Sequence, residues 1–167
     1  MKRTLYAVIA GLSLGLLAIT APTEAAAQRR AAPPSQTEVN ANVRELVAIN
    51  RLSCNVDAAR FIGRNNDGRT LYEVACVGAP GFLLLDTEPA QIVDCVANNG
   101  SVAARRAENP DGDPGAECTL ERNLNLAASV APLAQQAGVT CQVDDVRWVG
   151  STTEGATRYE IGRVEPV

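Results

Sequence analysis

The sequence predicts an α+β fold in which a helix and an antiparallel β-hairpin form a module, used in tandem in about one and a half copies and stabilised by disulfides. Three observations predict it: an internal repeat, period-two alternation of apolar residues around turn signals, and five cysteines that follow an export signal. The chain has 167 residues and no histidine. Histidine-based catalytic triads, Cys–His dyads and histidine-ligated metal sites are therefore excluded.

The amino terminus has the pattern of a secretory signal peptide. Lys2 and Arg3 precede an apolar stretch, and a run of alanines up to Ala27 offers small residues for cleavage. A membrane anchor is the alternative, but the apolar run is shorter than the roughly 20 residues of a membrane span. We expect residues 1–27 to be removed, residues 28–36 to be a linker, and the mature chain to be periplasmic or secreted.

The charge balance narrows the choice of partners. Cleavage would remove Lys2, Arg3 and Glu24 and change the formal net charge from −4 to −5. An acidic chain without a basic cluster lacks the surface that nucleic acids and anionic membranes require. We expect neither as a partner once the signal peptide is gone.

The repeat emerges when the chain is displaced against itself by 87 residues. Residues 52–74 then align without a gap with residues 139–161, and the density of identities indicates a structural module used twice. Apolar character is also kept where Phe61 aligns with Trp148. Identical pairs include Cys54 and Cys141, Asp57 and Asp144, Arg60 and Arg147, Gly68 and Gly155, Tyr72 and Tyr159, and Glu73 and Glu160.

Each copy has the pattern of a β-hairpin. Alternate residues from Leu52 to Ala58 are less polar than those between them, and the alternation shifts by one over residues 59–61, which predicts a β-bulge. The run 65–68 ends in Gly68 and predicts the turn, and Gly155 marks the turn of the second copy. On the return strand, one face would carry Thr70, Tyr72, Val74 and Cys76.

A helix is predicted before each hairpin. Ser35 and Glu38 form a capping box for the first helix, whose apolar face carries Val39, Val43, Leu46 and Val47. Ser129 would cap a shorter second helix that tolerates Pro132, turns Leu133 inward and ends at Gly138.

The region between the two copies completes the first module. Residues 81–85 form a continuous apolar run and predict a buried third strand. Thr87-Glu88-Pro89 predicts the start of a helix through Ala97, with Gly100 past its end and a loop insertion at residues 98–116. The modules are thus expected at residues 37–118 and, truncated before any third strand, at residues 119–167. The acidic residues of the insertion match a calcium loop poorly, and no metal or cofactor is expected.

The cysteines predict two bridges and one free thiol. A hairpin places Cys54 near Cys76, and Cys95 is then expected to pair with Cys118, although spacing alone does not determine connectivity. The counterpart of Cys76 in the second copy is Arg163, which leaves Cys141 without a partner. A buried inert thiol is favoured for Cys141; an intermolecular disulfide in a homodimer and a reactive nucleophile are the alternatives.

The repeated charged residues have two interpretations. Cross-strand ion pairs on the solvent side of each hairpin are favoured; a paired-carboxylate site or a recognition face is the alternative. The residues concerned are Asp57, Arg60 and Glu73 with their copies Asp144, Arg147 and Glu160. The aromatic residues of the two hairpins are expected to anchor the core and its rim.

One family resemblance follows from this order of elements. The helix, the strand, the turn with Asp67-Gly68, the run Tyr72-Glu73-Val74 and the apolar strand ending in Asp86 resemble the PepSY-type small exported domain, over residues 37–86 and partly over 129–164. The chain also looks similar to uncharacterised exported proteins of α-proteobacteria. The PepSY resemblance implies a non-catalytic module of the cell envelope or secreted fraction, in some members linked to the restraint of peptidases.

Three functions are then open. The first is a non-catalytic periplasmic or secreted binding or regulatory module that acts on an unidentified protein partner. The second is an envelope structural or oligomerising protein. Cys141 and the open edge of the second hairpin support this hypothesis, because either could join two chains. The third is a hydrolase that uses acidic residues alone, such as Asp144, Asp145 and Glu160; it is the least favoured because no cleft-forming motif supports it.

Overall fold

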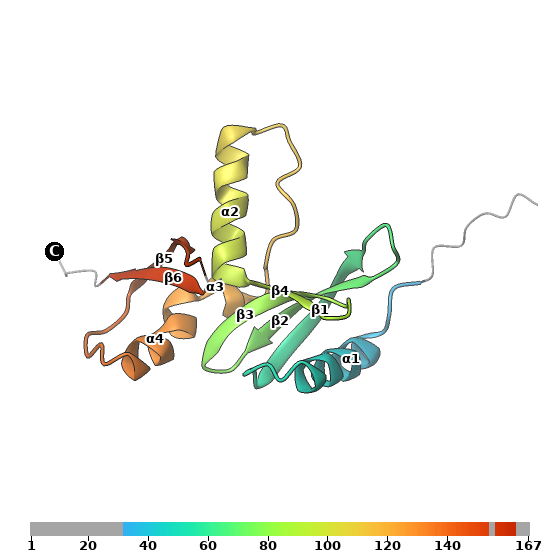
Figure 1. Ribbon diagram of the computed structural model, residues 1–167, viewed down its shortest axis with the longest axis horizontal. Coiled ribbons are helices and arrows are strands. Elements are labelled where there is room, and N and C mark those ends of the chain that lie inside the picture. The colour runs from blue at the N-terminus through green and yellow to red at the C-terminus, as the bar shows by residue number, and fades with distance from the viewer. Residues whose placement is uncertain (1–31, 154–155, 163–167) are drawn as a thin grey trace, which may run out of the picture. The chain divides into compact units, whose positions relative to one another are not determined.

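The computed structural model describes residues 32–153 and 156–162. These residues form α-helices and two sheets of antiparallel strands (Figure 1). The predicted α+β class is confirmed. The signal peptide, Gly155 and Arg163 lie outside the described residues. No helix in the described part of the chain is long and apolar enough to cross a membrane. The elements are α1 (Gln36–Ile49), β1 (Val56–Arg64), β2 (Thr70–Cys76), β3 (Ala79–Leu85), β4 (Gln91–Asp94), α2 (Cys95–Glu108), α3 (Glu121–Leu124), α4 (Leu126–Gln136), β5 (Asp145–Ser151) and β6 (Thr157–Gly162).

The first sheet has the strand order β1-β2-β3-β4, with neighbouring strands antiparallel. The predicted turn is present, with Gly68 in the left-handed region at φ 77°. The bulge was predicted at residues 59–61, and this position is wrong: the register shifts occur at Asp57 and Ile62. Arg60 lies directly opposite Glu73, and one bulged residue of β1 lies on each side of this pair along the strand.

One face of this sheet is covered by α1, which begins with the predicted capping box of Ser35 and Glu38. Its buried valines pack against alternate residues of β2 and β3, because period-3.6 and period-2 patterns each put apolar side chains on one face. The cluster includes Val39, Val43, Val47, Tyr72, Val74, Cys76, Phe82 and Leu84.

The opposite face carries a second cluster around Leu83, Cys95 and Cys118. β2 and β3 are therefore buried on both faces, which explains the continuous apolar run that predicted β3. The predicted bridges are both present, Cys54–Cys76 with a sequence separation of 22 and Cys95–Cys118 with a separation of 23.

The predicted helix over residues 87–97 is wrong. Residues 91–94 form β4, which pairs with β3, and the helix begins at Cys95 with Asp94 as its cap. α2 then continues to Glu108, so most of the expected loop insertion at residues 98–116 is helical. Gly100 lies inside α2 because Trp148 packs against it: a Cβ there would come within 3.1 Å of Trp148 Cε3.

The second helix also starts earlier than predicted. Asn125, at the end of α3, caps α4 by accepting a hydrogen bond from the Ala128 amide at 3.1 Å, and Ser129 lies within the helix. Leu133, which was expected to point inward, is 36% exposed. The predicted end at Gly138 is confirmed by its φ of 84°.

The second hairpin repeats the register of the first. Arg147 pairs with Glu160 and Trp148 with Tyr159, and the register shift before Gly150 matches the one before Gly63. β5 and β6 form a two-stranded sheet, and a third cluster packs it on α2 and α4 through Val96, Val130 and Val146. Both hairpins belong to one compact unit that begins at Ala32.

Candidate functional site

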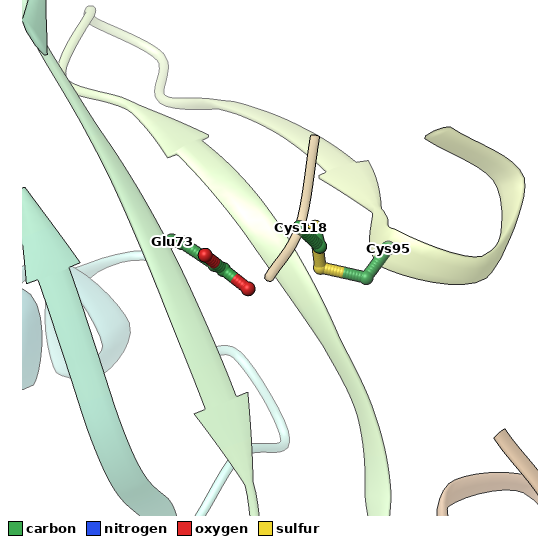
Figure 2. A group of neighbouring side chains, drawn as sticks. All are labelled: Glu73, Cys95 and Cys118. Carbon is green, nitrogen blue, oxygen red and sulfur yellow. A yellow bond between two sulfur atoms is a disulfide. The ribbon is translucent and has the colours of Figure 1, made fainter. Parts of the chain in front are cut away.

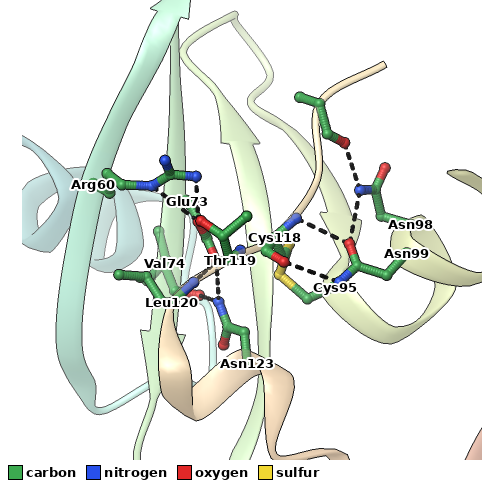
Figure 3. A network of polar contacts seen from close by, with 11 residues as sticks. Arg60, Glu73, Val74, Cys95, Asn98, Asn99, Cys118, Thr119, Leu120 and Asn123 are labelled. Atoms are coloured by element: carbon green, nitrogen blue, oxygen red, sulfur yellow. Dashed lines mark hydrogen bonds and ion pairs between the residues drawn. A yellow bond between two sulfur atoms is a disulfide. The ribbon is translucent and has the colours of Figure 1, made fainter. Parts of the chain in front are cut away.

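Glu73 accepts more hydrogen bonds than any other of the recurring charged residues, and Figure 3 shows its partners. Its side chain is fully buried, and Arg60 on the neighbouring strand donates to Oε2 at 2.8 Å. Oε1 accepts the backbone N–H groups of Thr119 and Leu120 at 2.6 and 2.7 Å. Because a carboxylate has about four lone-pair positions, these bonds and the one from Asn123 occupy Glu73 completely. Glu73 is therefore a structural anchor.

The other donors to Glu73 come from residues 116–123, which we call the covering segment because it lies over the β2–β3 face of the first sheet. Asn123 is 2% exposed and donates to Glu73 Oε1 at 3.0 Å and to the Val74 carbonyl at 3.2 Å. A Cβ at Gly81 would overlap both Asn123 and the Val74 carbonyl oxygen. Glycine at position 81 thus lets the covering segment approach the sheet closely.

The covering segment is also held from the other side by α2. The Asn99 side chain donates to the Cys118 carbonyl at 3.0 Å and accepts from the Cys118 amide at 2.9 Å. Asn98 donates to the Ala116 carbonyl at 2.8 Å. With the Cys95–Cys118 disulfide, these bonds attach the segment to α2 and, through Glu73, to the sheet (Figure 3).

Glu73, Cys95 and Cys118 lie close enough to raise the question of a metal site (Figure 2). Their potential ligand atoms are within 4.8 Å of one another. A metal requires deprotonated thiolates, and here the two sulfur atoms are bonded to each other. Since the Glu73 oxygens are also occupied by hydrogen bonds, these residues do not fit a metal ion.

The equivalent pair of the second hairpin has a different environment. Arg147 Nε donates to Glu160 Oε2, as Arg60 does to Glu73, but the two side chains are 70% and 54% exposed. The hydrogen bond that Arg147 donates to Glu160, and then the negative charge of that carboxylate, raise the pKa of Arg147 above its ordinary value. Within the described residues, no segment covers this pair as residues 116–123 cover Glu73.

The prediction of solvent-side ion pairs is therefore correct for one hairpin and wrong for the other. Both Arg–Glu pairs cross the strands as expected, but Glu73 is buried because a remote segment folds over it. Asp57 was expected in the same cross-strand set and instead pairs with Arg122 at 2.8 Å. Its copy Asp144 accepts a hydrogen bond from Gln142 at 2.7 Å.

Asp57 and Arg122 border a shallow cavity of about 490 Å³ between β1, β2 and the α3–α4 region. Glu121 and Asn125 line it as well. The ion pair between Asp57 and Arg122 lines this cavity and links β1 to α3. The carboxylates considered for a hydrolase are not among its lining residues. Asp144, Asp145 and Glu160 do not form a cluster of ligand oxygens within the described chain.

The two repeated tyrosines pack in hydrophobic clusters, as expected of core and rim anchors, and each also makes a hydrogen bond outside its hairpin. Tyr72 is 3% exposed, and its hydroxyl oxygen accepts from Asn42 at 3.3 Å. Tyr159 donates to Asp94 Oδ2 at 2.6 Å, while Oδ1 of the same carboxylate caps α2. Burial, and then the hydrogen bond to Asp94, raise the pKa of Tyr159 well above its usual value.

Cys141 is free, as predicted, but the expectation that it is buried is wrong. It is exposed and precedes β5, which begins only at Asp145. Residues 139–143 therefore do not form an inward strand face that would bury this thiol. Both alternatives for Cys141, the intermolecular bridge and the reactive thiol, need the accessibility that it has.

Sequence reasoning missed several residues that build the Glu73 environment. They lie outside the repeat and carry no apolar periodicity, so neither signal that located the hairpins applies to them. A polar residue whose role is to fill hydrogen bonds of a distant carboxylate has no local signature. The residues are Asn98, Asn99, Thr119 and Asn123.

Comparison of the chain with protein-family models, with curated proteins and with solved structures finds no match. The function is therefore inferred from the chain's own residues.

Proposed function

We propose that the protein is a non-catalytic binding or regulatory module of the periplasm or secreted fraction that holds a protein partner. The observation that supports this proposal is the exposed Arg147–Glu160 pair, whose equivalent in the first hairpin is covered by a peptide segment. A peptidase is the class of partner that the resemblance to PepSY-type domains suggests. Two disulfides are in keeping with an oxidising compartment.

The first hairpin shows what chemistry binds such a pair. Glu73 accepts two successive backbone N–H groups and one side-chain amide from the covering segment. Hydrogen bonds from N–H groups to a carboxylate are stronger than those between neutral groups. Glu160 stands in the same register opposite an arginine and has accessible oxygens. A partner segment that offers successive N–H groups, as Thr119 and Leu120 do, would complement it.

The carboxylates that recur in the repeat support a binding role over a catalytic one. Glu73 is saturated by hydrogen bonds, and Asp57 and Glu160 are each paired with an arginine. A general acid or base needs a proton position that is free to exchange with substrate. Glu160, which is exposed, has the features of a recognition residue.

Affinity capture with chemical cross-linking tests this proposal. The purified protein and its Glu160→Gln and Arg147→Ala variants would be exposed to the periplasmic or secreted fraction, and bound proteins quantified by mass spectrometry. The matched control is Arg106→Ala, which removes another exposed Arg–Glu pair, formed with Glu117 at 3.0 Å. A partner held by the wild type and the control but lost from both site variants supports the proposal; equal recovery from all four proteins contradicts it.

A further inference from the structure

We propose that two copies of this chain pair along the free edge of β6, antiparallel, with Tyr159 opposite the second copy's Tyr159. This self-association goes beyond partner binding at the Arg147–Glu160 face, because it uses backbone groups at the sheet edge. It joins two two-stranded sheets into one four-stranded sheet with the order β5-β6-β6-β5.

The edge is available because β6 pairs with β5 alone in the described residues. Its repeat equivalent, β2, is paired on both sides, by β1 and by β3. The helices that pack on the second hairpin, α2 and α4, lie principally along β5.

The backbone of β6 determines which residues face outward. The Ala156 and Gly162 carbonyls, at the two ends of the strand, accept hydrogen bonds from Thr152 and Asp144 on the β5 side. Backbone groups alternate in direction along an antiparallel strand, so the odd-numbered residues direct theirs to the open edge. A two-fold axis at Tyr159 places these outward groups opposite one another.

The charges select this register. With Tyr159 on the axis, Arg158 of each copy lies opposite Glu160 of the other copy. This arrangement gives two equivalent cross-strand ion pairs. A shift by two residues in either direction places Arg158 opposite Arg158, or Glu160 opposite Glu160. A shift by one residue turns the outward backbone groups away from their partners. The strand is thus complementary to itself in one register.

The other free strand edges are less suited to pairing. Bulges at Asp57 and Ile62 distort β1, and the shift at Val149 distorts β5. Bulged edges are a common protection against edge-to-edge association. β4 is regular but covers only Gln91–Asp94 and leads directly into α2. The register shifts of the second hairpin fall on β5, which leaves β6 regular.

Sedimentation velocity of the purified protein tests the proposal. All variants would carry Cys141→Ser, so that an intermolecular disulfide does not contribute to the mass. Because an edge of a few residues buries a small area, we expect a reversible dimer at protein concentrations from about 10 μM to about 1 mM. A monomer throughout that range would overturn the proposal.

Charge reversal then tests the register. Arg158→Glu alone and Glu160→Arg alone place like charges opposite each other, and each is expected to weaken self-association at least about tenfold. An equimolar mixture of the two variants restores opposite charges across the β6 edge and is expected to form a heterodimer more tightly than either variant associates with itself. Arg106→Glu, a reversal away from β6, is the control and should dimerise normally. A mixture that stays monomeric, or single variants that dimerise like the wild type, would contradict pairing along β6.

Discussion

The Arg60–Glu73 and Arg147–Glu160 pairs show how much burial changes the energetic role of one residue pair. They occupy equivalent positions in the two hairpins. Glu73 is fully buried among N–H donors, whereas Glu160 is 54% exposed. Exposed ion pairs contribute little to stability because water screens them, while a buried carboxylate depends on every partner it has.

We predict that Glu73→Gln lowers the free energy of unfolding by about 3 kcal/mol or more, because the new amide hydrogens oppose the N–H groups that the carboxylate accepts. Glu160→Gln, the matched change in the second hairpin, should leave stability nearly unchanged. Urea denaturation with the disulfides intact measures both. Equal losses from the two substitutions would mean that the covering segment does not depend on Glu73.

Tyr159 provides a pH-dependent prediction at the same scale. Its pKa is raised in the folded protein, so the neutral hydroxyl is the form that folding favours. The stability it contributes is complete below the unfolded pKa of about 10 and is lost as pH rises above that value toward the folded pKa. Tyr159→Phe should cost about 1 kcal/mol at pH 8 and flatten the decline of stability between pH 8 and pH 11. Denaturation at the two pH values checks this, and an unchanged slope in the variant would exclude Tyr159 as its source.

Among the elements, α1 ends in a way that its sequence does not favour. The Arg51 amide donates to Ala48 and the Leu52 amide to Val47, and this requires Arg51 to adopt a positive φ of 53°. Glycine is the usual residue at this position of a helix end, because a side chain there is strained. The helix is retained because its valines are buried in the first core.

We predict that Arg51→Gly raises the free energy of unfolding by about 0.5–1 kcal/mol through release of this strain. Arg44→Gly, an exposed position inside the same helix, should lower it by about 1 kcal/mol, since glycine is a poor helix former. Thermal denaturation of the two variants compares the signs directly. A destabilising effect at both positions would show that the helix end tolerates arginine without strain.

At the scale of the whole molecule, the two disulfides hold chain segments together more firmly than the three hydrophobic clusters would alone. Cys54–Cys76 joins the ends of the first hairpin, and Cys95–Cys118 attaches the covering segment to α2. The separations of 22 and 23 residues are each expected to stabilise the fold by roughly 3 kcal/mol. The cluster around Cys95–Cys118 has only Leu83 as a further buried residue, so this disulfide is expected to contribute a substantial part of the local stability.

We predict that thiol labelling of the native protein modifies one cysteine, Cys141, and that peptide mapping recovers the Cys54–Cys76 and Cys95–Cys118 bridges. Replacement of Cys95 and Cys118 together by alanine should also expose the covering segment to proteolysis. Replacement of Cys54 and Cys76 is the matched control and should leave that segment protected. Recovery of a Cys54–Cys141 bridge would overturn the assignment of the modules.

Much of the fold could be predicted because the information was local or repeated. The capping box of α1, the turn at Gly68 and the apolar run of β3 are each encoded within a few residues. The 87-residue repeat then carried the hairpin and its Arg–Glu register from one copy to the other. The bridge prediction followed from the hairpin itself.

Two of the failures involve contact with distant segments. Residues 91–94 form a strand paired with β3, and α2 continues through Gly100, against which Trp148 packs. Tertiary pairing of this kind outweighs a local tendency of a few tenths of a kcal/mol per residue.

By itself the sequence predicted the class of fold, the two hairpins and cross-strand ion pairs among their recurring charged residues, and it favoured the two disulfides that the structure contains. Only the tertiary structure decided that Glu73 is buried and that Glu160 is exposed. The physical reason is that register follows from neighbouring residues along the strand, whereas burial depends on which remote segment folds across it. Here residues 116–123 cover one copy of the repeat and leave the other exposed.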